Sequence, residues 1–572
     1  MFQTSVLNLL RPFTEALGYI SKINRLVEII MQCFNRAFWP VFFLLTQALA
    51  GHGNTARVTC TEEFKPISAA EFVAGMNPGW NLVTYTDHFL TGSPSWTIDP
   101  SWLQRVSDVV DMATERGFYV VTNMHHDSSW VDVTKSDANL SMIYEKFQQS
   151  WQQIGEKLGC KSSLLAFEPI NEPPANTAED GAKINILNRV FLNGLARSGG
   201  FNTQRVVTLV GGSMDPSKTS QWFVKPRNIV NPWALQYHYY NPYDFTFNAW
   251  GKTIWGSEDD KKAVLTDLDI VRDNFTDVPL VIGEYDAFPQ QCETAARHKW
   301  LDFVTRQAAA RNTSVMVWDN GDAYLDRAAS KWRDPVGIDI MIDAAKGISN
   351  TLAESTVDPL APTQSSSAYI FHRVGEDVTD QTVDLQLNGN ALVKIEAGTG
   401  EALQSADFSI SGSSVVFKAG FLSKYLSPTA EPGSKANLTL TFSAGAPVQV
   451  EIVQWDTPEL ATTSSVAVAG ADLKIPVTFK GLSRLATVKM VEIDGTYLFD
   501  EWTKWLGPLQ QARGTYDSQW RWDKDSVILT ANTVNAVIAA GKTTAFTFEF
   551  YPRVPANAVN YTLQAVASSR FM

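Results

Sequence analysis

Two apolar, strand-like runs of the chain each end with a glutamate. The first is "AFEPINEPPA" (166–175), which presents Asn171 and Glu172, and the second is "PLVIGEYDA" (279–287), which presents Glu284. A single carboxylate at the end of a strand is usually a solvated loop charge. A pair gains chemical meaning if the fold brings the two together, because one can then act as an acid while the other acts as a base or nucleophile.

Histidines and aromatic residues end other strand-like runs. "YVVTNMHH" ends with His125 and His126, "ALQYHYY" contains His238 and ends with Tyr240, and "SVMVWDNGD" contains Trp318. Three histidines could suggest a metal site, but neighbouring residues of a strand point to opposite faces, so one ion is not easily shared by all three. The chain also lacks a helical HExxH pair, and we therefore expect no metal and no other cofactor.

The segments between these runs have the spacing of amphipathic helices. In "SWLQRVSDVVDMATERG" (101–117), apolar residues from Leu103 to Ala113 recur at i, i+3 or i+4. Similar helical patterns occupy 140–158, 180–198, 258–273 and 293–311. Alternation of strands and helices predicts a parallel sheet of the α/β class, and at this length a (β/α)8 TIM barrel is the best candidate.

In such a barrel the carboxyl ends of the strands surround one mouth, where catalytic residues lie. Taken singly, Glu172 and Glu284 are more readily explained as structural charges, and Trp318 as a core residue. Taken together at successive strand ends, they predict one cleft with two carboxylates. Glycoside hydrolysis requires this pair: one protonates the leaving oxygen, and the other attacks the anomeric carbon or activates water.

Six short motifs in this order resemble those of the glycoside hydrolase family 5 endoglucanases, in clan A of the (β/α)8 glycosidases. They are "GWNL" (79–82), "NMHH" (123–126), "INEP" (170–173), "HYY" (238–240), "IGEY" (282–285) and "VWDNG" (317–321). The resemblance implies a secreted endo-β-1,4-glucanase for cellulose or a related β-glucan. A xyloglucanase or mannanase of the same family remains an alternative.

The resemblance makes Glu172 the acid/base and Glu284 the nucleophile, and it implies retention of configuration. Glu172 must then start protonated, with a raised pKa, while Glu284 must be ionised. The other site residues are expected around the sugar being cleaved. Their implied roles are a bond to the 2-hydroxyl (Asn171), a neighbour of the acid/base (His238), a donor to the nucleophile (Tyr240), a stacking platform (Trp318) and cleft walls (His125 and His126).

One departure from the family pattern follows "GWNL". The chain runs directly into Val83, so a βα unit is missing, together with an arginine that would help to keep Glu284 ionised. We count about seven strands for the barrel. Closing a ring on seven would distort its mouth, and an open barrel would instead expose strand edges and apolar core, which would make the protein poorly soluble. We therefore expect this chain to be a poor hydrolase, and a disabled polysaccharide-binding protein is the alternative reading.

Composition limits the partners. The chain has 572 residues, and its net charge of −13 argues against nucleic acid or an anionic membrane surface. It contains 18 tryptophans, which suit stacking on sugar rings, although surplus tryptophan also fills cores. A β-glucan is the expected partner, and we expect a monomer.

The N-terminal region resembles an export signal. Residues 38–50 form an apolar run that is too short for a membrane span, which takes about 20 residues. Arg36 precedes the run, a small-residue cleavage pattern ends it, and Met31 would start a normal signal peptide. We predict that 1–50 is a miscalled start plus a signal peptide and that the mature protein is extracellular, with no membrane segment. A genuine N-terminal helix and anchor is the alternative.

Secretion would leave Cys60, Cys160 and Cys292, which allows one disulfide of undetermined pairing and one free cysteine. Acceptor triplets for N-glycosylation are compatible with a secreted glycoprotein; they begin at Asn139, Asn274, Asn312, Asn437 and Asn560.

The helical pattern disappears beyond residue 355, and short alternating strands follow. We predict a catalytic barrel at 51–355, an immunoglobulin-like β-sandwich spacer at 356–456 and a β-sandwich carbohydrate-binding module at 457–572. The last two resemble the spacer and family 46 module of three-module endoglucanases. Four tryptophans of the last unit are candidate sugar-binding residues, with core packing as the equal alternative: Trp502, Trp505, Trp520 and Trp522.

Overall fold

The computed structural model describes residues 2–7, 57–82, 89–125, 130–398, 400–500 and 502–565, with only the backbone of 2–7. The predicted signal segment, the junction after Leu82 and His126 therefore lie outside the described residues, apart from residues 2–7. The chain forms two compact units. The first comprises Met1–Tyr239, Leu265–Asp286 and Gln307–Arg333, and the second comprises Tyr240–Val264, Ala287–Arg306 and Asp334–Met572.

The first unit contains a closed ring of strands. Seven described strands run parallel: β2 (Gly79–Leu82), β3 (Tyr119–Met124), β4 (Leu165–Phe167), β5 (Val207–Val210), β6 (Trp233–Tyr239), β7 (Leu280–Tyr285) and β8 (Thr313–Asp319). Strands β3 to β8 pair in chain order, and β8 pairs with β2. Their residues are almost all buried, as expected for a parallel sheet covered on both faces. The predicted barrel is confirmed.

The missing βα unit leaves a gap between β2 and β3. Strand β1 (Phe2–Leu7) fills it and pairs antiparallel with both neighbours, with Thr4 opposite Leu82 on one side and Thr122 on the other. The ring therefore closes on eight strands, so the count of about seven strands is wrong, and neither a ring of seven nor an open barrel supports the expectation of a poor hydrolase. The physical reason is that two unpaired strand edges would leave backbone donors and acceptors unsatisfied.

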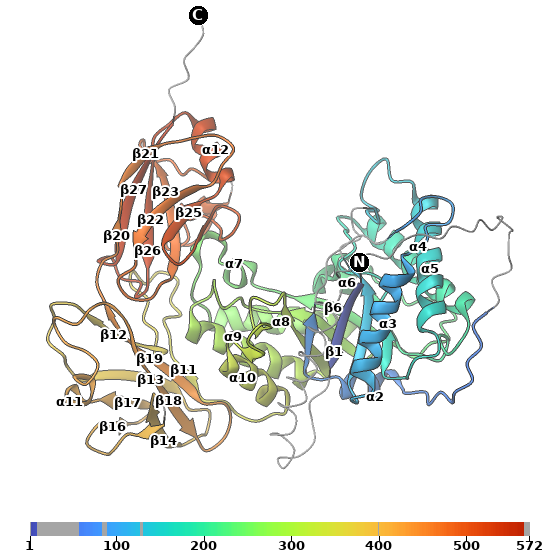
Figure 1. The fold of residues 1–572 in the computed structure, drawn as a ribbon, viewed down its shortest axis with the longest axis horizontal. Coiled ribbons are helices and arrows are strands. Elements are labelled where there is room, and N and C mark those ends of the chain that lie inside the picture. Colours follow the sequence, from blue (N-terminus) through green and yellow to red (C-terminus); the bar gives the residue numbers. More distant parts are fainter. Residues whose placement is uncertain are drawn as a thin grey trace, which may run out of the picture. The chain divides into compact units, whose positions relative to one another are not determined.

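The helices form where the sequence predicts them. The long ones are α3 (Pro100–Thr114), α4 (Leu140–Leu158), α5 (Ala178–Ser198), α8 (Glu258–Asn274) and α9 (Thr294–Ala310). Side chains cap their starts; Thr177 and Asp180, for example, form a reciprocal capping box at α5. Helices α3, α4 and α5 pack against one another in order (Figure 1).

A short helix closes the end of the barrel opposite the strand tips. Phe72 and Val73 of α2 (Ala69–Gly75) pack with buried residues near the starts of the strands, such as Val121 and Val281. This apolar plug fixes the barrel floor. The remaining short elements connect or decorate the barrel: α6 (Pro216–Trp222), α7 (Tyr243–Thr246), α10 (Pro335–Ala345), η2 (Gly212–Met214), η3 (Ala249–Gly251), β9 (Leu325–Asp326) and β10 (Lys331–Trp332).

The second unit includes two β-sandwiches (Figure 1). The first pairs the sheets β11-β13-β17-β16 and β12-β19-β18-β14-β15 around a core with Val383, Phe417 and Leu440. Its elements are β11 (Leu352–Ala353), β12 (Tyr369–Arg373), β13 (Gln381–Gln386), β14 (Leu392–Ala397), β15 (Glu401–Ala402), β16 (Phe408–Ser411), β17 (Ser414–Phe417), α11 (Ala419–Leu422), β18 (Gly433–Phe442) and β19 (Val448–Trp455).

The second sandwich pairs β20-β22-β25-β24 with β21-β27-β26-β23. Its elements are β20 (Glu459–Leu460), β21 (Ser464–Val466), β22 (Leu473–Thr478), β23 (Leu485–Glu492), η4 (Thr503–Trp505), β24 (Trp520–Trp522), β25 (Ser526–Leu529), α12 (Ala531–Ala540), β26 (Thr544–Phe550) and β27 (Ala558–Gln564). Helix α12 corrects the expectation that helices disappear beyond residue 355, because Val534 and Val537 bury one helical face in this core. Within the described residues, no helix has the length and apolarity needed to cross a membrane.

A disulfide joins Cys60 to Cys160, while Cys292 is a buried thiol that donates to the carbonyl of Phe245. The bridge spans 100 residues of sequence, so it should stabilise the barrel by about 4 to 5 kcal/mol, because it restricts the unfolded chain.

We predict that Cys160→Ser lowers the free energy of unfolding by roughly this amount in denaturant titrations, and that a reductant then has no further effect. A loss below about 1 kcal/mol would contradict the prediction.

Candidate active site

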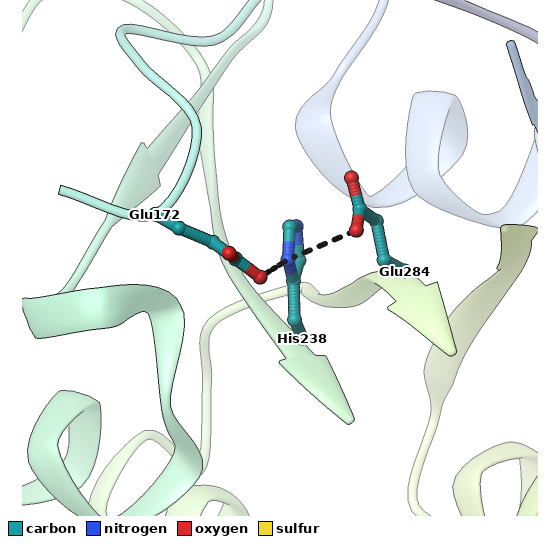
Figure 2. A group of neighbouring side chains, drawn as sticks. All are labelled: Glu172, His238 and Glu284. Carbon is teal, nitrogen blue, oxygen red and sulfur yellow. Dashed lines mark hydrogen bonds and ion pairs between the residues drawn. The ribbon is translucent and has the colours of Figure 1, made fainter. Parts of the chain in front are cut away.

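Glu172, His238 and Glu284 meet at the ends of three barrel strands (Figure 2). Glu172 follows β4, His238 belongs to β6 and Glu284 belongs to β7. The Nδ1 atom of His238 lies 2.7 Å from Oε1 of Glu172 and 3.5 Å from Oε2 of Glu284. The side chains of His238 and Glu284 are buried, whereas that of Glu172 is 45% exposed. The histidine thus lies between two carboxylates, one of which is open to solvent.

The backbone at these strand ends is irregular in two places. Glu172 adopts a φ of 40°, a left-handed conformation that non-glycine residues rarely adopt outside functional or strained sites. Strand β7 carries a bulge, because Tyr237 is opposite Ile282 while the next residue, His238, is opposite Glu284. The extra residue is Gly283. The bulge turns Glu284 towards His238, which a regular strand would not do.

The charge of His238 follows from this position. Burial alone would lower its pKa, but the charge of Glu284, the hydrogen bond to Glu172 and the charges of Glu172 and Glu168 outweigh burial and raise the pKa to about 9. His238 is therefore an imidazolium at neutral pH. It supplies a cation beside Glu284, in a chain whose sequence lacks the arginine expected for that purpose.

Asn171 is buried beside the pair. Its backbone N–H donates to the carbonyl of Met124 in β3, which fixes the segment that follows β4. Its side-chain Oδ1 is buried and accepts no hydrogen bond from the described residues. A buried acceptor without a protein donor is suited to a hydroxyl group of a ligand.

The structure places most of the other predicted residues around the same strand ends. His125 follows β3 and is fully buried, and Trp318 lies half-buried on β8, opposite Asn81 of β2. Tyr240 follows β6 and belongs to the second unit, where its ring stacks parallel to Phe288 with centroids 6.5 Å apart.

Sequence reasoning missed three polar residues of the barrel interior. Asn81 donates to the carbonyl of Gly283 at 3.2 Å and to Oε1 of Glu284 at 3.5 Å. Glu168, which directly follows β4, and Gln236, two residues before His238 on β6, contact each other. The available signals were weak: Asn81 lies within "GWNL", and Glu168 is one of two glutamates in "AFEPINEP".

By distance alone, Glu172, His238 and Glu284 could hold a metal, since one ligand atom from each lies within 4.8 Å of the others. Metal binding needs a neutral imidazole nitrogen. The raised pKa of His238 and its 2.7 Å hydrogen bond to Glu172 keep a proton between the two residues, so this arrangement suits proton transfer better than metal binding.

The four tryptophans of the last sandwich divide into two groups. Trp520 is fully buried and donates its Nε1–H to the carbonyl of Gly514, and Trp522 packs partly buried beside it. Trp502 and Trp505 are 63% and 77% exposed. The geometry therefore makes Trp502 and Trp505 available to a ligand and assigns Trp520 to the core.

Comparison with known proteins agrees with this architecture. Residues 74–324 match the family described as Cellulase (glycosyl hydrolase family 5), and residues 364–452 match Carbohydrate binding domain X2. A solved tri-modular GH5 (subfamily 4) endo-beta-1,4-glucanase from Bacillus licheniformis is 32% identical, covers 86% of this chain and 92% of its own, and superposes with a TM-score of 0.74. Its complex with cellotetraose matches at 31% identity over 88% and 94% of the two chains, with a TM-score of 0.75.

Among sequence relatives, Endoglucanase B of Paenibacillus lautus is 28% identical over 431 residues, which are 72% of each chain. A barrel with paired glutamates at the ends of β4 and β7 defines the scaffold of a glycosidase. The chain belongs to glycosyl hydrolase family 5 and is an endoglucanase that acts on β-glucans. The unit for which the sequence predicted a spacer is the one that matches the X2 domain.

We predict that His238→Gln lowers kcat/KM on a soluble β-glucan by about 10²–10³-fold, because it removes the cation between the carboxylates. Glu284 should then ionise less readily, so the acidic limb of the pH–rate profile should move to higher pH. Lys135→Gln, which removes an exposed cation from the same unit, is the control. An unchanged acidic limb in the histidine variant would contradict the electrostatic role.

The same substitution should alter the pH dependence of stability. Because the folded-state pKa of His238, about 9, exceeds its ordinary value of 6.5, its contribution is complete below pH 6.5 and is lost as pH rises through 9. Denaturant titrations between these pH values should show this loss in the native chain and not in His238→Gln.

Proposed function

We propose that the chain hydrolyses β-1,4-glucan by a retaining, double-displacement mechanism. The main support for this proposal is a distance: one oxygen of Glu172 and one of Glu284 lie within 4.8 Å of each other. Retaining enzymes hold the two carboxyl groups about 5–5.5 Å apart, whereas inverting enzymes need about 6.5–9.5 Å to admit a water molecule.

The surroundings of the two glutamates support different roles for them. Glu284 is buried, with His238 on one side and a donor from Asn81 on the other, so it suits an ionised nucleophile that attacks the anomeric carbon. Glu172 is partly exposed, so a leaving oxygen and water can reach it, and it shares a hydrogen bond with His238 through which a proton can move, so it suits the group that donates a proton to the leaving oxygen. In the second step Glu172 would accept a proton from water, which then releases the sugar from Glu284.

Asn171 and Trp318 fit substrate contacts. The buried Oδ1 of Asn171 can accept a hydrogen bond from the 2-hydroxyl of the sugar being cleaved, a contact that strengthens in the transition state. Trp318 is half-buried on β8, and an indole at this strand end suits stacking on a sugar ring. Tyr240, His125 and His126 keep their proposed places around this sugar.

We also propose that the protein is secreted. Its disulfide between Cys60 and Cys160 is typical of oxidising compartments, and the asparagines of all five glycosylation triplets are exposed. The proposed miscalled start and signal peptide at 1–50 include strand β1, which closes the barrel in the described structure, so a mature chain cleaved near residue 50 would need another segment in the place of β1. The domain limits at 355 and 456 remain proposals.

The catalytic roles are tested by removing each carboxylate in turn. We predict that Glu172→Gln and Glu284→Gln each reduce hydrolysis of carboxymethyl cellulose by at least about 10³-fold, because each loses several kcal/mol of transition-state stabilisation. Azide should rescue Glu284→Gly and give a product of inverted configuration. Near-normal turnover by either glutamine variant would disprove the assignment. Xyloglucan and mannan, assayed in parallel, decide between the substrate classes.

We further propose that Trp502 and Trp505 bind glucan. Replacing either with Ala should weaken pull-down on insoluble glucan and leave the melting temperature unchanged, because both side chains are exposed. Trp520→Ala is the matched control: it should cost about 3–5 kcal/mol of stability, because it empties a core position. Full glucan affinity in a Trp502→Ala, Trp505→Ala double variant would exclude this surface.

A further inference from the structure

A second layer of polar side chains lies inside the barrel, one layer below the catalytic residues. Glu168 immediately follows β4, and its side chain is 1% exposed. Its Oε1 accepts a hydrogen bond from Nδ2 of Asn123 on β3 at 2.7 Å, and its Oε2 accepts one from Nε2 of Gln236 on β6. The backbone N–H of Glu168 donates to the carbonyl of Thr122, so Glu168 is held through both its backbone and its carboxyl group.

This layer continues directly into the catalytic layer. Gln236 is two residues before His238 on the same strand, so both side chains face the barrel interior. Gly283 leaves room for Gln236, because a Cβ atom at that position would lie 2.2 Å from Nε2 of Gln236. Gly283 is also the bulge residue before Glu284. A bridge from Asn123 through Glu168 to Gln236 therefore lies beneath both members of the His238–Glu284 pair.

A carboxyl at this depth needs an explanation. The interior of such a barrel is normally filled by branched apolar side chains, and a buried carboxyl is costly even when it is hydrogen-bonded. Burial raises the pKa of Glu168 to about 7, against the opposing effects of the Asn123 hydrogen bond and the positive charge of His238. The charged groups that act on it are His238 from β6 and Glu284 from β7, while β3 faces it with the amide of Asn123.

We propose that Glu168 is a positioning residue of the catalytic site. It orients the strand ends through its hydrogen bonds with Asn123 and Gln236. When it is ionised, it also raises the pH at which the Glu172–His238 pair loses its shared proton. The inference rests on the proposed acid/base role of Glu172. An additional negative charge beneath His238 favours the protonated imidazolium and makes loss of the shared proton less favourable. Below neutral pH Glu168 is itself protonated and has no such effect.

This charge behaviour predicts a one-sided change in the pH–rate profile. Glu168→Gln keeps the shape of the side chain but cannot ionise. The basic limb of kcat/KM, which reports loss of the acid's proton, should move to lower pH by on the order of one unit. The acidic limb should remain in place, because a neutral glutamine resembles the protonated carboxyl present there. A purely structural role would instead lower kcat by the same factor at every pH.

The experiment compares Glu168→Gln with Glu179→Gln, which removes a carboxylate from the exposed surface of α5. Both limbs of the control should match those of the native chain. Infrared difference spectra provide an independent readout: a protonated carboxyl band that titrates near neutral pH should be present in the native chain and absent from Glu168→Gln. An unmoved basic limb, or a persisting band, would overturn the proposal.

A second variant covers the case in which Glu168→Gln unfolds. Asn123→Ala keeps the carboxyl but removes the donor that stabilises its charge, so the infrared band should titrate at higher pH and the basic limb should again move down. A basic limb that stays in place while the band moves would overturn the proposal. Glu172→Gln, measured in parallel, separates this outcome from failure of the acid/base assignment, because normal turnover in that variant would refute the assignment itself.

Discussion

The active site depends on one interaction, the contact of the buried imidazolium of His238 with two carboxylates. Glu172 and Glu284 come from strands that are separated by more than a hundred residues of sequence, and like charges held this close would repel each other without a cation between them. Two irregular stretches of backbone bring the carboxyl groups into this contact. The left-handed backbone at Glu172 directs one carboxyl inward, and the bulge at Gly283 aligns the other with the histidine.

Closing the barrel is the second constraint. The strand ends hold their geometry only if the ring is continuous, because an open sheet between β2 and β3 would leave two unpaired edges next to Asn81 and His125. In the described structure the N-terminal strand β1 occupies that position in the antiparallel direction. An antiparallel strand can fill the gap because either direction of pairing satisfies the backbone groups of its neighbours.

The sequence predicted the local features well. Hydrophobic periodicity located the parallel strands from β3 to β8 and the helices between them, because each of these depends on contacts within a short segment. The convergence of Glu172 and Glu284 followed from the barrel rule alone. Strand β1 could not be predicted in this way, because its pairing depends on partners more than seventy residues away and not on its own pattern. The exposure of Trp505 and the burial of Trp520 also depend on tertiary packing, since both lie in similar aromatic segments.

The arginine missing from the family pattern could not be weighed from the sequence alone. Its absence predicts that Glu284 is difficult to ionise, but the ionisation of a buried carboxyl depends on every charge around it. The charges of Glu284, Glu172 and Glu168 and the hydrogen bond to Glu172 together raise the pKa of His238 to about 9, against the effect of burial. The described site therefore places one cation, His238, 3.5 Å from Glu284 in a chain that lacks the arginine of the family pattern.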